Sequence, residues 1–331
     1  MSRVRNDVVD WAEEGRIRPD AIRDALRITE VTPTPSQWRR FLDRLALWLG
    51  VILLAFGLIF FFAFNWASLG RFAKFGLVEL PLVAAIILVY RLRLDNFKGK
   101  ALLLGAALLM GALLALVGQT YQTGADTYEL FAVWALAILP WAAVGRFGAL
   151  WLFWIGLLNL AVWFYYHAFG GLFRMLLWGG PDRFLEVLWA FFVLNTAALL
   201  VWELAASRVR WLDERWTVRV LAVVSGGIVT ALALWALIQP EKGLAAAWIA
   251  YIAWIIVAYL VYRHWRRDLF VLAAGALSVI AMVTGLLSKA LITSITNTGG
   301  AGALLMIGLV VIGMSAGAAY WLKSVAAEGA S

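Results

Sequence analysis

The sequence contains no cysteine and only two histidines among its 331 residues. The lack of cysteine excludes disulfide bonds, thiolate catalysis and Cys-ligated metals. His167 and His264 are far apart in the sequence, so a His-rich zinc site is not expected. GxSxG, Walker, HExxH and Rossmann glycine motifs are also missing, which argues against an ATP-driven pump or a familiar membrane hydrolase. We therefore predict neither a metal nor a cofactor.

The sequence has few charged residues and several long apolar runs. Charged residues make up 15% of the chain and hydrophobic residues 64%, whereas an average soluble domain is about a quarter charged. The run 45–64 has no charge over the roughly 20 residues that cross a hydrocarbon core of about 30 Å. Because lipid cannot hydrogen-bond a backbone, such runs must be helices. We predict an all-α, polytopic bundle of about ten spans, the other nine near 72–90, 100–118, 129–145, 149–168, 184–203, 219–238, 244–262, 269–288 and 301–322.

The basic residues predict how the spans are oriented. Nine Arg precede the first span, and thirteen further Lys and Arg fall in alternate loops and at the end of the last span, against six in the remaining loops. Short cytoplasmic loops are enriched in Lys and Arg, so we expect both termini in the cytosol of a bacterium and a multi-pass protein of its inner membrane. The net charge of +8 is then a topology signal that faces anionic lipid headgroups, and nucleic-acid binding is not expected.

The first part of the chain predicts a small helical hairpin in the cytosol. A short helix is expected over 6–14, ended by Gly15, and a second helix with an apolar stripe is expected from Pro19 onward. The run TPTP at 32–35 interrupts the helix, and Ser36 can cap a new one that continues into the first span. We divide the chain into this hairpin (1–36), a transmembrane domain (37–323) and a short cytosolic tail (324–331). Since so small a hairpin buries little surface alone, it should lean on the membrane face or on a protein partner.

The most distinctive polar segment joins the third and fourth spans on the predicted outer side. A connecting turn there needs little more than Gly124, so the surplus of hydrogen-bonding side chains predicts a structured polar rim or a binding site. Asn65 ends the first span on the same side. It either joins this pocket or satisfies free carbonyls at the helix end while Trp66 anchors in the interface.

Glu79 is the sharpest single residue, about two turns below the outer end of the second span. An ionised carboxylate at that depth costs several kcal/mol unless it is paired or wetted. It could carry a proton or bind a cation, or it could be a structural acid paired with Lys74. The candidate polar pocket comprises Asn65, Glu79, Gln119, Tyr121, Asp126, Tyr128 and Glu129.

Other polar and small residues favour structural roles. Asn159 and Asn195 lie in the middle of two spans and should hydrogen-bond to each other between helices. Gly313 and Gly317 form a GxxxG pattern typical of close helix packing. Glu203 is expected to be a solvated interfacial charge. Eight tryptophans at span ends predict an aromatic belt at the headgroup layer: Trp66, Trp141, Trp151, Trp178, Trp202, Trp216, Trp265 and Trp321.

Four of these features together resemble the DUF2157 family of uncharacterised bacterial membrane proteins. They are the turn Gly15-Arg16-Ile17 in the leader, the pair Asn65-Trp66, the group Gln119, Tyr121, Gly124 and Asp126, and Trp134 with Pro140 in the next helix. The resemblance covers roughly the first 145 residues and rests on hydrophobicity and span count beyond them. It implies a polytopic membrane protein and no particular activity.

Three functions remain open at this stage. The first is a non-catalytic accessory or sensory membrane protein whose hairpin binds a partner. The second is a transporter or channel for a small solute or ion, with Glu79 and the segment 119–126 lining an outward-facing pocket. The third is an enzyme on lipid-linked substrates, which would need two carboxylates at one cleft. The sequence favours a protein without catalytic activity, and it does not specify an oligomeric state.

Overall fold

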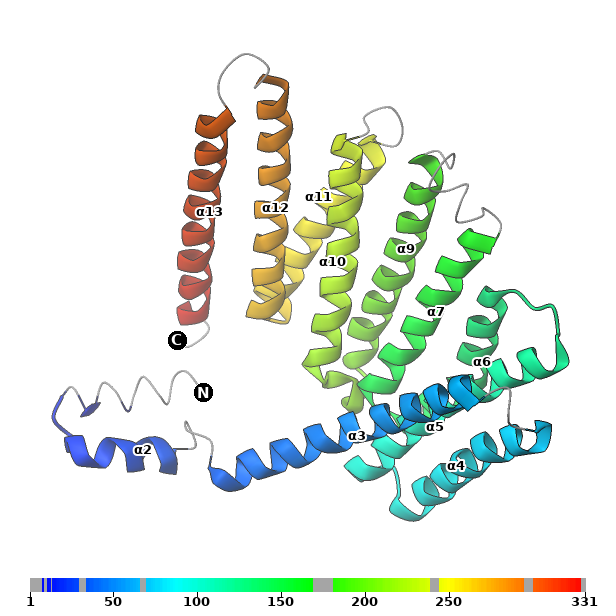
Figure 1. Ribbon diagram of the computed structural model, residues 1–331. Coiled ribbons are helices and arrows are strands. Elements are labelled where there is room, and N and C mark those ends of the chain that lie inside the picture. The colour runs from blue at the N-terminus through cyan, green and yellow to red at the C-terminus, as the bar shows by residue number, and fades with distance from the viewer. Residues whose placement is uncertain are drawn as a thin grey trace. The chain divides into compact units, whose positions relative to one another are not determined.

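The computed structural model describes residues 8, 11–12, 14–29, 34–65, 70–168, 181–238, 244–294 and 300–328. The regular elements in these ranges are all helices, as Figure 1 shows, and the all-α prediction is confirmed. The chain divides into two compact units, Met1–Leu116 and Val117–Gly329. Each is described separately below.

Nine of the helices in the described ranges are long and apolar enough to cross a membrane. They match the second to tenth predicted spans one for one. The first predicted span, 45–64, falls within α3 (Pro35–Asn65). The nine are α4 (Arg71–Leu92), α5 (Phe97–Tyr121), α6 (Thr127–Gly145), α7 (Gly148–Ala168), α9 (Pro181–Ala206), α10 (Arg215–Ile238), α11 (Leu244–Leu260, with a π turn at Val261–Trp265), α12 (Leu269–Ser294) and α13 (Gly300–Glu328).

Before α3, the chain forms short helical pieces close to those predicted. Gly15 takes a φ of +71°, which ends the first piece, and η1 (Pro19–Ala21) leads into α2 (Ile22–Ile28). The cap of α3 differs from the prediction of Ser36. Thr34 Oγ1 accepts the backbone N–H of Gln37, and Gln37 Oε1 accepts that of Thr34. This reciprocal capping box places Thr34 at the helix start, with Pro35 in the first turn where its missing N–H costs nothing.

In the first unit, both α3 and α4 pack on α5. The contact between α4 and α5 is an apolar cluster around the buried Val78 and Leu116. On α3, Val51 lies so close to Gly105 of α5 that an added Cβ at the glycine would approach its Cγ1 to 2.7 Å. Small residues on α5 therefore allow the close helix approach that replaces hydrophobic driving force inside a membrane.

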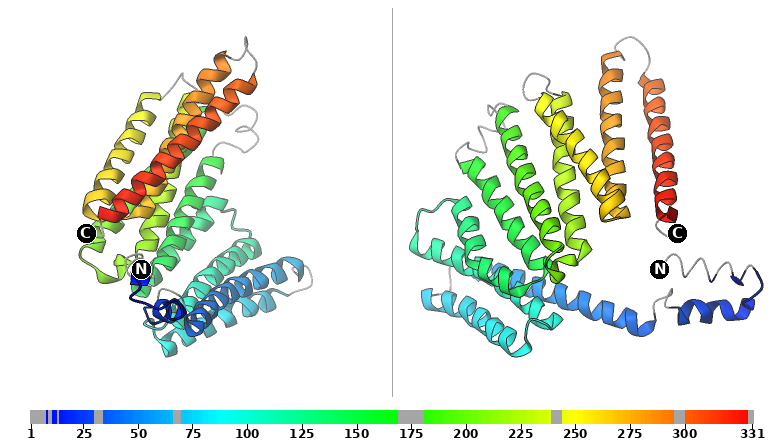
Figure 2. Two further views of the ribbon diagram at one scale, coloured as in Figure 1. Left: turned by 90° about the vertical axis from the view of Figure 1, so that its left-hand side faces the viewer. Right: turned by 180° about the vertical axis from the view of Figure 1, so that it is seen from behind.

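In the second unit, α10 is the central helix. It packs against α9, α11 and α12, and α11 lies on one side of the row formed by α9, α10 and α12, as Figures 1 and 2 show. Gly226 of α10 lies against the Trp254 ring of α11, where a Cβ would come within 2.6 Å of the indole. The unit also contains the helix pair α6 and α7, and α13 packs on α12.

The glycine pattern of α13 does not pack as predicted within the chain. Gly313 and Gly317 are exposed, and a Cβ added at either would meet nothing within 4 Å. The close helix packing that the GxxxG pattern predicted is thus not made against the described residues of this chain.

The described loops of the second unit lie at two opposite ends. The α6–α7, α9–α10 and α11–α12 connections share one end with the last residue of α13, because Gly148 abuts Thr217 and Arg263 pairs with Glu328. We call it the charged end. The segment 119–129 lies at the other, the polar-loop end. The predicted inner loops of this unit therefore do lie together, and the assignment of the charged end to the cytosol stays a prediction.

Candidate functional site

The predicted pocket residues fall in both units. Asn65 is the last residue of α3, and its side chain lies outside the described residues. Glu79 is exposed on α4 in the first unit, away from the buried face formed by Val78, Leu82 and Ala85. The other five candidates belong to the second unit. One shared pocket remains a prediction.

The five candidates of the second unit lie on a structured polar loop. Gln122 has a φ of +47°, and the N–H of Thr123 bonds the carbonyl of Gly118 at 3.3 Å, which closes the end of α5. Asp126 precedes α6 without capping it through its side chain. Gln119, Tyr121 and Asp126 are exposed. These side chains lie at the surface of the loop, and the polar rim or binding site stays a prediction.

The last two candidates pair with each other on the first turn of α6. The Tyr128 hydroxyl donates to Glu129 Oε1 at 3.2 Å, and the Tyr128 ring meets Tyr165 of α7 edge-on at 5.3 Å. Both side chains are half-buried. The pair therefore ties the polar loop to α7.

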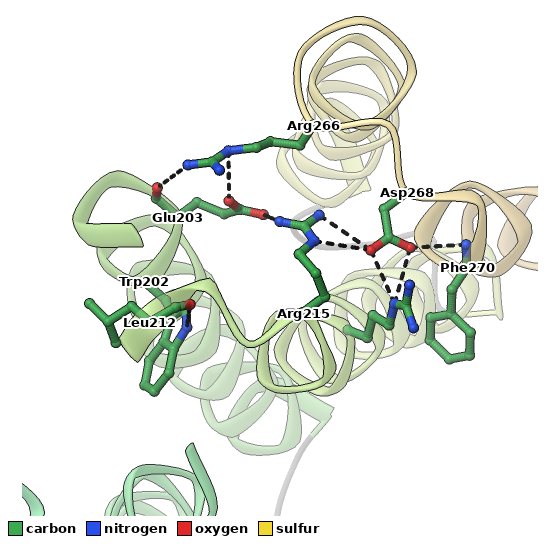
Figure 3. Close-up of polar contacts among 8 residues, drawn as sticks. Trp202, Glu203, Leu212, Arg215, Arg266, Asp268 and Phe270 are labelled. Carbon is green, nitrogen blue, oxygen red and sulfur yellow. Dashed lines mark hydrogen bonds and ion pairs between the residues drawn. The ribbon is translucent and has the colours of Figure 1, made fainter. Parts of the chain in front are cut away.

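The charged end holds a connected ion network that the sequence did not predict, drawn in Figure 3. The Asp268 side chain is 2% exposed, and its Oδ2 forms ion pairs with Arg219 Nε at 3.0 Å and Arg215 Nη2 at 3.3 Å. Arg215 also forms an ion pair with Glu203, from Nη1 to Oε1 at 3.3 Å, and Arg266 Nε lies 3.6 Å from Glu203 Oε2. Four helix ends are thereby tied together, those of α9, α10, α11 and α12.

Glu203 corrects an expectation from the sequence. It was predicted to be solvated, yet its side chain is only 13% exposed and lies between Arg215 and Arg266. Buried carboxylates need such partners, because an unpaired ion away from water costs several kcal/mol. The helix ends supply them from residues 12 and 63 positions further along the chain.

Local structure at the α11–α12 junction positions the network. Asp268 caps α12, accepting the N–H of Phe270 at 3.1 Å. The preceding π turn is closed by the N–H of Arg266 bonding the carbonyl of Val261 at 2.9 Å. Such turns insert one residue into a helix and occur frequently at functional sites. Here the turn buries Tyr262, and the guanidinium of Arg215 stacks over its ring at 5.9 Å.

Tryptophans brace the same end from the side of α7 and α9. Trp202 is 5% exposed and donates from Nε1 to the carbonyl of Leu212 at 3.1 Å. Its ring also contacts those of Trp151 and Trp211. The Trp202 ring is therefore buried against the α9–α10 connection and does not lie at the chain surface, as a ring of the predicted aromatic belt would. Trp265 is 82% exposed at the chain surface, in agreement with an interfacial ring.

A groove of about 560 Å³ lies beside the network, between α9 and α11. Its walls are mainly apolar and include Leu199, Leu200, Leu204, Val257, Ala258 and Val261. Glu203, Ser207 and Arg266 line it at the charged end, and Thr196 and Trp254 line it deeper in the unit. The volume is within the range of about 300–1,000 Å³ usual for ligand sites.

Polar side chains inside the second unit pair with one another across helices. Asn195 donates to Asn159 Oδ1 at 2.7 Å and accepts from its Nδ2 at 3.2 Å, so the predicted amide pair is confirmed. Ser225 contacts Thr196 Oγ1 at 2.6 Å and accepts from Trp254 Nε1 at 3.0 Å. A third set joins Thr230, Ser278 and Tyr251. No group of three or more His, Asp or Glu that could hold a metal occurs in the described ranges.

The N-terminal part of the chain is similar to a known family. Residues 9–151 match DUF2157, a family described as predicted membrane proteins. The resemblance predicted from the motifs is confirmed over this range. Together with the nine apolar helices, the match places the protein in a membrane. No curated protein matches the chain, and no solved structure does.

The DUF2157 match separates the two candidate regions. All seven predicted pocket residues lie inside 9–151, and the ion network lies outside this range. Sequence reasoning missed the network because its members lie beside two connections, α9–α10 and α11–α12, that are about 50 residues apart in the sequence. One signal was present, since Asp268 is an acid directly after Arg266 and Arg267 and directly before an apolar run.

Proposed function

We propose that the protein is a non-catalytic accessory or sensory membrane protein of the bacterial inner membrane, with both termini in the cytosol. One observation carries the proposal. The polar side chains inside the second unit, such as Asn159 and Asn195, bond one another across helices, and the buried ionic side chains of that unit gather at the charged end. This arrangement suits a packed scaffold with a charged surface.

A transport path has a different requirement. Its polar groups must exchange their partners for water or solute during transport, and intramembrane ionisable residues are the usual markers of such paths. Three described pairs of hydroxyl or amide groups at mid-helix instead complete one another's hydrogen bonds across helices, which stabilises a fixed packing. Partner binding is supported at the predicted hairpin, where Trp11 is 45% and Ile28 82% exposed.

The chain has no cysteine, so single-cysteine labelling tests the proposal directly. Asn195→Cys and Thr230→Cys probe the interior, and Ser207→Cys and Thr123→Cys are exposed controls. In permeabilised membrane vesicles, a water-soluble maleimide should modify both controls and leave both interior positions unmodified, because maleimides need a hydrated thiolate. Modification of the interior positions at the rate of the controls would reveal a wet path and favour the transporter.

A second measurement addresses the hairpin. Deletion of residues 1–36 should abolish whatever phenotype the intact protein complements in cells, and Glu79→Gln should preserve it. Equal membrane levels of both variants, measured by an epitope tag, are the control. Loss of complementation by Glu79→Gln with an innocuous deletion would refute the accessory function.

A further inference from the structure

We propose that the groove between α9 and α11 binds one anionic phospholipid, with an acyl chain along its apolar walls and the phosphate at Arg266. The inference goes beyond the proposed function and does not depend on it. Four features of the groove carry it: its length, the chemistry of its walls, the charge at its end and the π turn that shapes it.

The length of the groove fits one leaflet. From Thr196 to the end of α9 at Ala206 the helix rises about 15 Å, which is half of a hydrocarbon core of about 30 Å. The residues that line the groove on α9 cover this same stretch. A lipid whose headgroup lies at the charged end would thus place its chain alongside the groove down to the level of Thr196.

The walls change from apolar to charged in the direction that a lipid requires. Leu200, Leu204 and Val257 line the groove and are at least half exposed, so its mouth opens sideways from the unit. At the depth of Thr196, the Trp254 indole is bonded to Ser225 and forms a fixed floor. A soluble anion would gain nothing from such walls, whereas the acyl chain of a membrane lipid packs against them along its length, as it does against other apolar side chains in a bilayer.

The charge at the end of the groove is complementary to a phosphate. The network contains three guanidinium groups, those of Arg215, Arg219 and Arg266, and two carboxylates, those of Glu203 and Asp268, so it carries one net positive charge. Each Glu203 oxygen lies next to an arginine, Oε1 next to Arg215 and Oε2 next to Arg266. The negative charge of this carboxylate is therefore compensated and repels a phosphate less. Arg266 is the arginine that lines the groove itself. Planar guanidinium groups bind phosphate oxygens with paired, charge-assisted hydrogen bonds.

The π turn shapes the mouth of the groove. Val261, Tyr262 and Trp265 of the turn all line it, and Arg266 follows directly. A regular α-helix at this place would lack the one residue that the π turn inserts, and these side chains would point in other directions around the helix. The strongly exposed Trp265 lies beside Arg266, where an indole suits the headgroup layer. Trp265 and Arg266, two side chains that suit a lipid headgroup, therefore lie next to each other at the charged end of the apolar groove.

The experiment compares lipid retention by the full-length protein in detergent, measured by native mass spectrometry. Phosphatidylglycerol and phosphatidylcholine with the same acyl chains are added at equal concentration. The expected result is one retained phosphatidylglycerol per chain and little phosphatidylcholine. Arg266→Gln should lower this retention about tenfold, the equivalent of one charged hydrogen bond, and Arg267→Gln removes the same charge from the neighbouring residue as a control.

A second pair of variants blocks the groove without touching the network. Val257→Trp fills the wall from a side chain that is 51% exposed, and Ile256→Trp places the same ring on a neighbouring residue that is 52% exposed and outside the groove. Val257→Trp should abolish retention, and Ile256→Trp should preserve it. Equal retention of both lipids, equal effects of the two Trp variants, or displacement of the lipid by soluble glycerol phosphate would each overturn the proposal.

Discussion

The two ends of the second unit hold polar residues in opposite ways. At the polar-loop end, hydrogen-bonding residues crowd into the segment 119–129 and several of them are exposed. At the charged end, Glu203, Arg215 and Asp268 are separated by long helices in the sequence, yet their side chains meet in one network. Density of polar residues along a sequence is thus a poor guide to how strongly they are held.

The difference follows from what each end has to satisfy. A polar loop in water exchanges its bonds with solvent at little cost, so its residues need not contact one another. A carboxylate among apolar helices has no such exchange and requires fixed cationic partners. Asp268 therefore constrains the structure around it far more than Asp126 does, although both residues directly precede a helix.

The largest expected effect concerns the side of the membrane on which each end lies. In intact cells, a membrane-impermeant thiol reagent should label Thr123→Cys and should not label Ser207→Cys, which should react only after the cells are permeabilised. The Lys and Arg distribution predicts this all-or-none contrast. The cysteine-free parent is the blank, and labelling of both positions in intact cells would contradict the assignment of the charged end to the cytosol.

The next effect compares Asp268 with Asp126. Asp268→Ala should lower the free energy of unfolding in detergent by about 3 kcal/mol, because Arg215 and Arg219 lose their buried partner. The value is at the low end of the usual range, since the Arg219 side chain is 43% exposed and keeps some water. Asp126→Ala removes an exposed acid whose side chain does not cap α6. It should change the free energy of unfolding by less than about 0.5 kcal/mol.

A third variant separates the two roles of Asp268. Asp268→Asn keeps an oxygen that can accept the N–H of Phe270, so it should recover the cap, worth about 1 kcal/mol, and still lack the ion pairs. Thermal unfolding of all three variants in the same detergent measures the differences. Equal stability of Asp268→Ala and Asp126→Ala would show that the network adds nothing.

Hydropathy predicted the spans well because lipid leaves the backbone no alternative to the helix. The start of α3 was also encoded locally, since Gln37 stands three residues after Thr34 in the capping-box pattern, although Ser36 is an equally good capping residue by type. The predicted pocket could be named from the sequence, but bringing Glu79 and Asp126 together depends on the placement of separate helices, about which residue spacing says nothing.

The network was beyond sequence reasoning for a related reason. Which arginine reaches Glu203 depends on α10 lying between α9 and α12, and on the π turn that directs Arg266 toward α9. Arg208 is closer in sequence, yet Glu203 pairs with Arg215 and Arg266. Packing order decides such contacts, and it is set by many apolar contacts that no short motif records.

The smallest expected effect concerns a contact between the two ends that the sequence did predict. Asn159 and Asn195 exchange hydrogen bonds near the middle of α7 and α9, and Asn195 is 2% exposed. Replacing either Asn by Leu should lower the free energy of unfolding by about 1 kcal/mol, since the remaining buried amide loses its hydrogen-bond partner. The double variant should cost little more than either single one, with a coupling energy of about 0.6 kcal/mol.

A double-mutant cycle in detergent unfolding measures this coupling, and a cycle of Asn159→Leu with Ser278→Ala is the matched control. Ser278 bonds to Thr230 and Tyr251, so its change should add to that of Asn159 within about 0.5 kcal/mol. A coupling of zero for the Asn pair would mean that sequence reasoning found the right contact for the wrong energetic reason. The stability of this unit would then reside in its other contacts: apolar packing, the charged end and the hydroxyl groups that bond one another across helices.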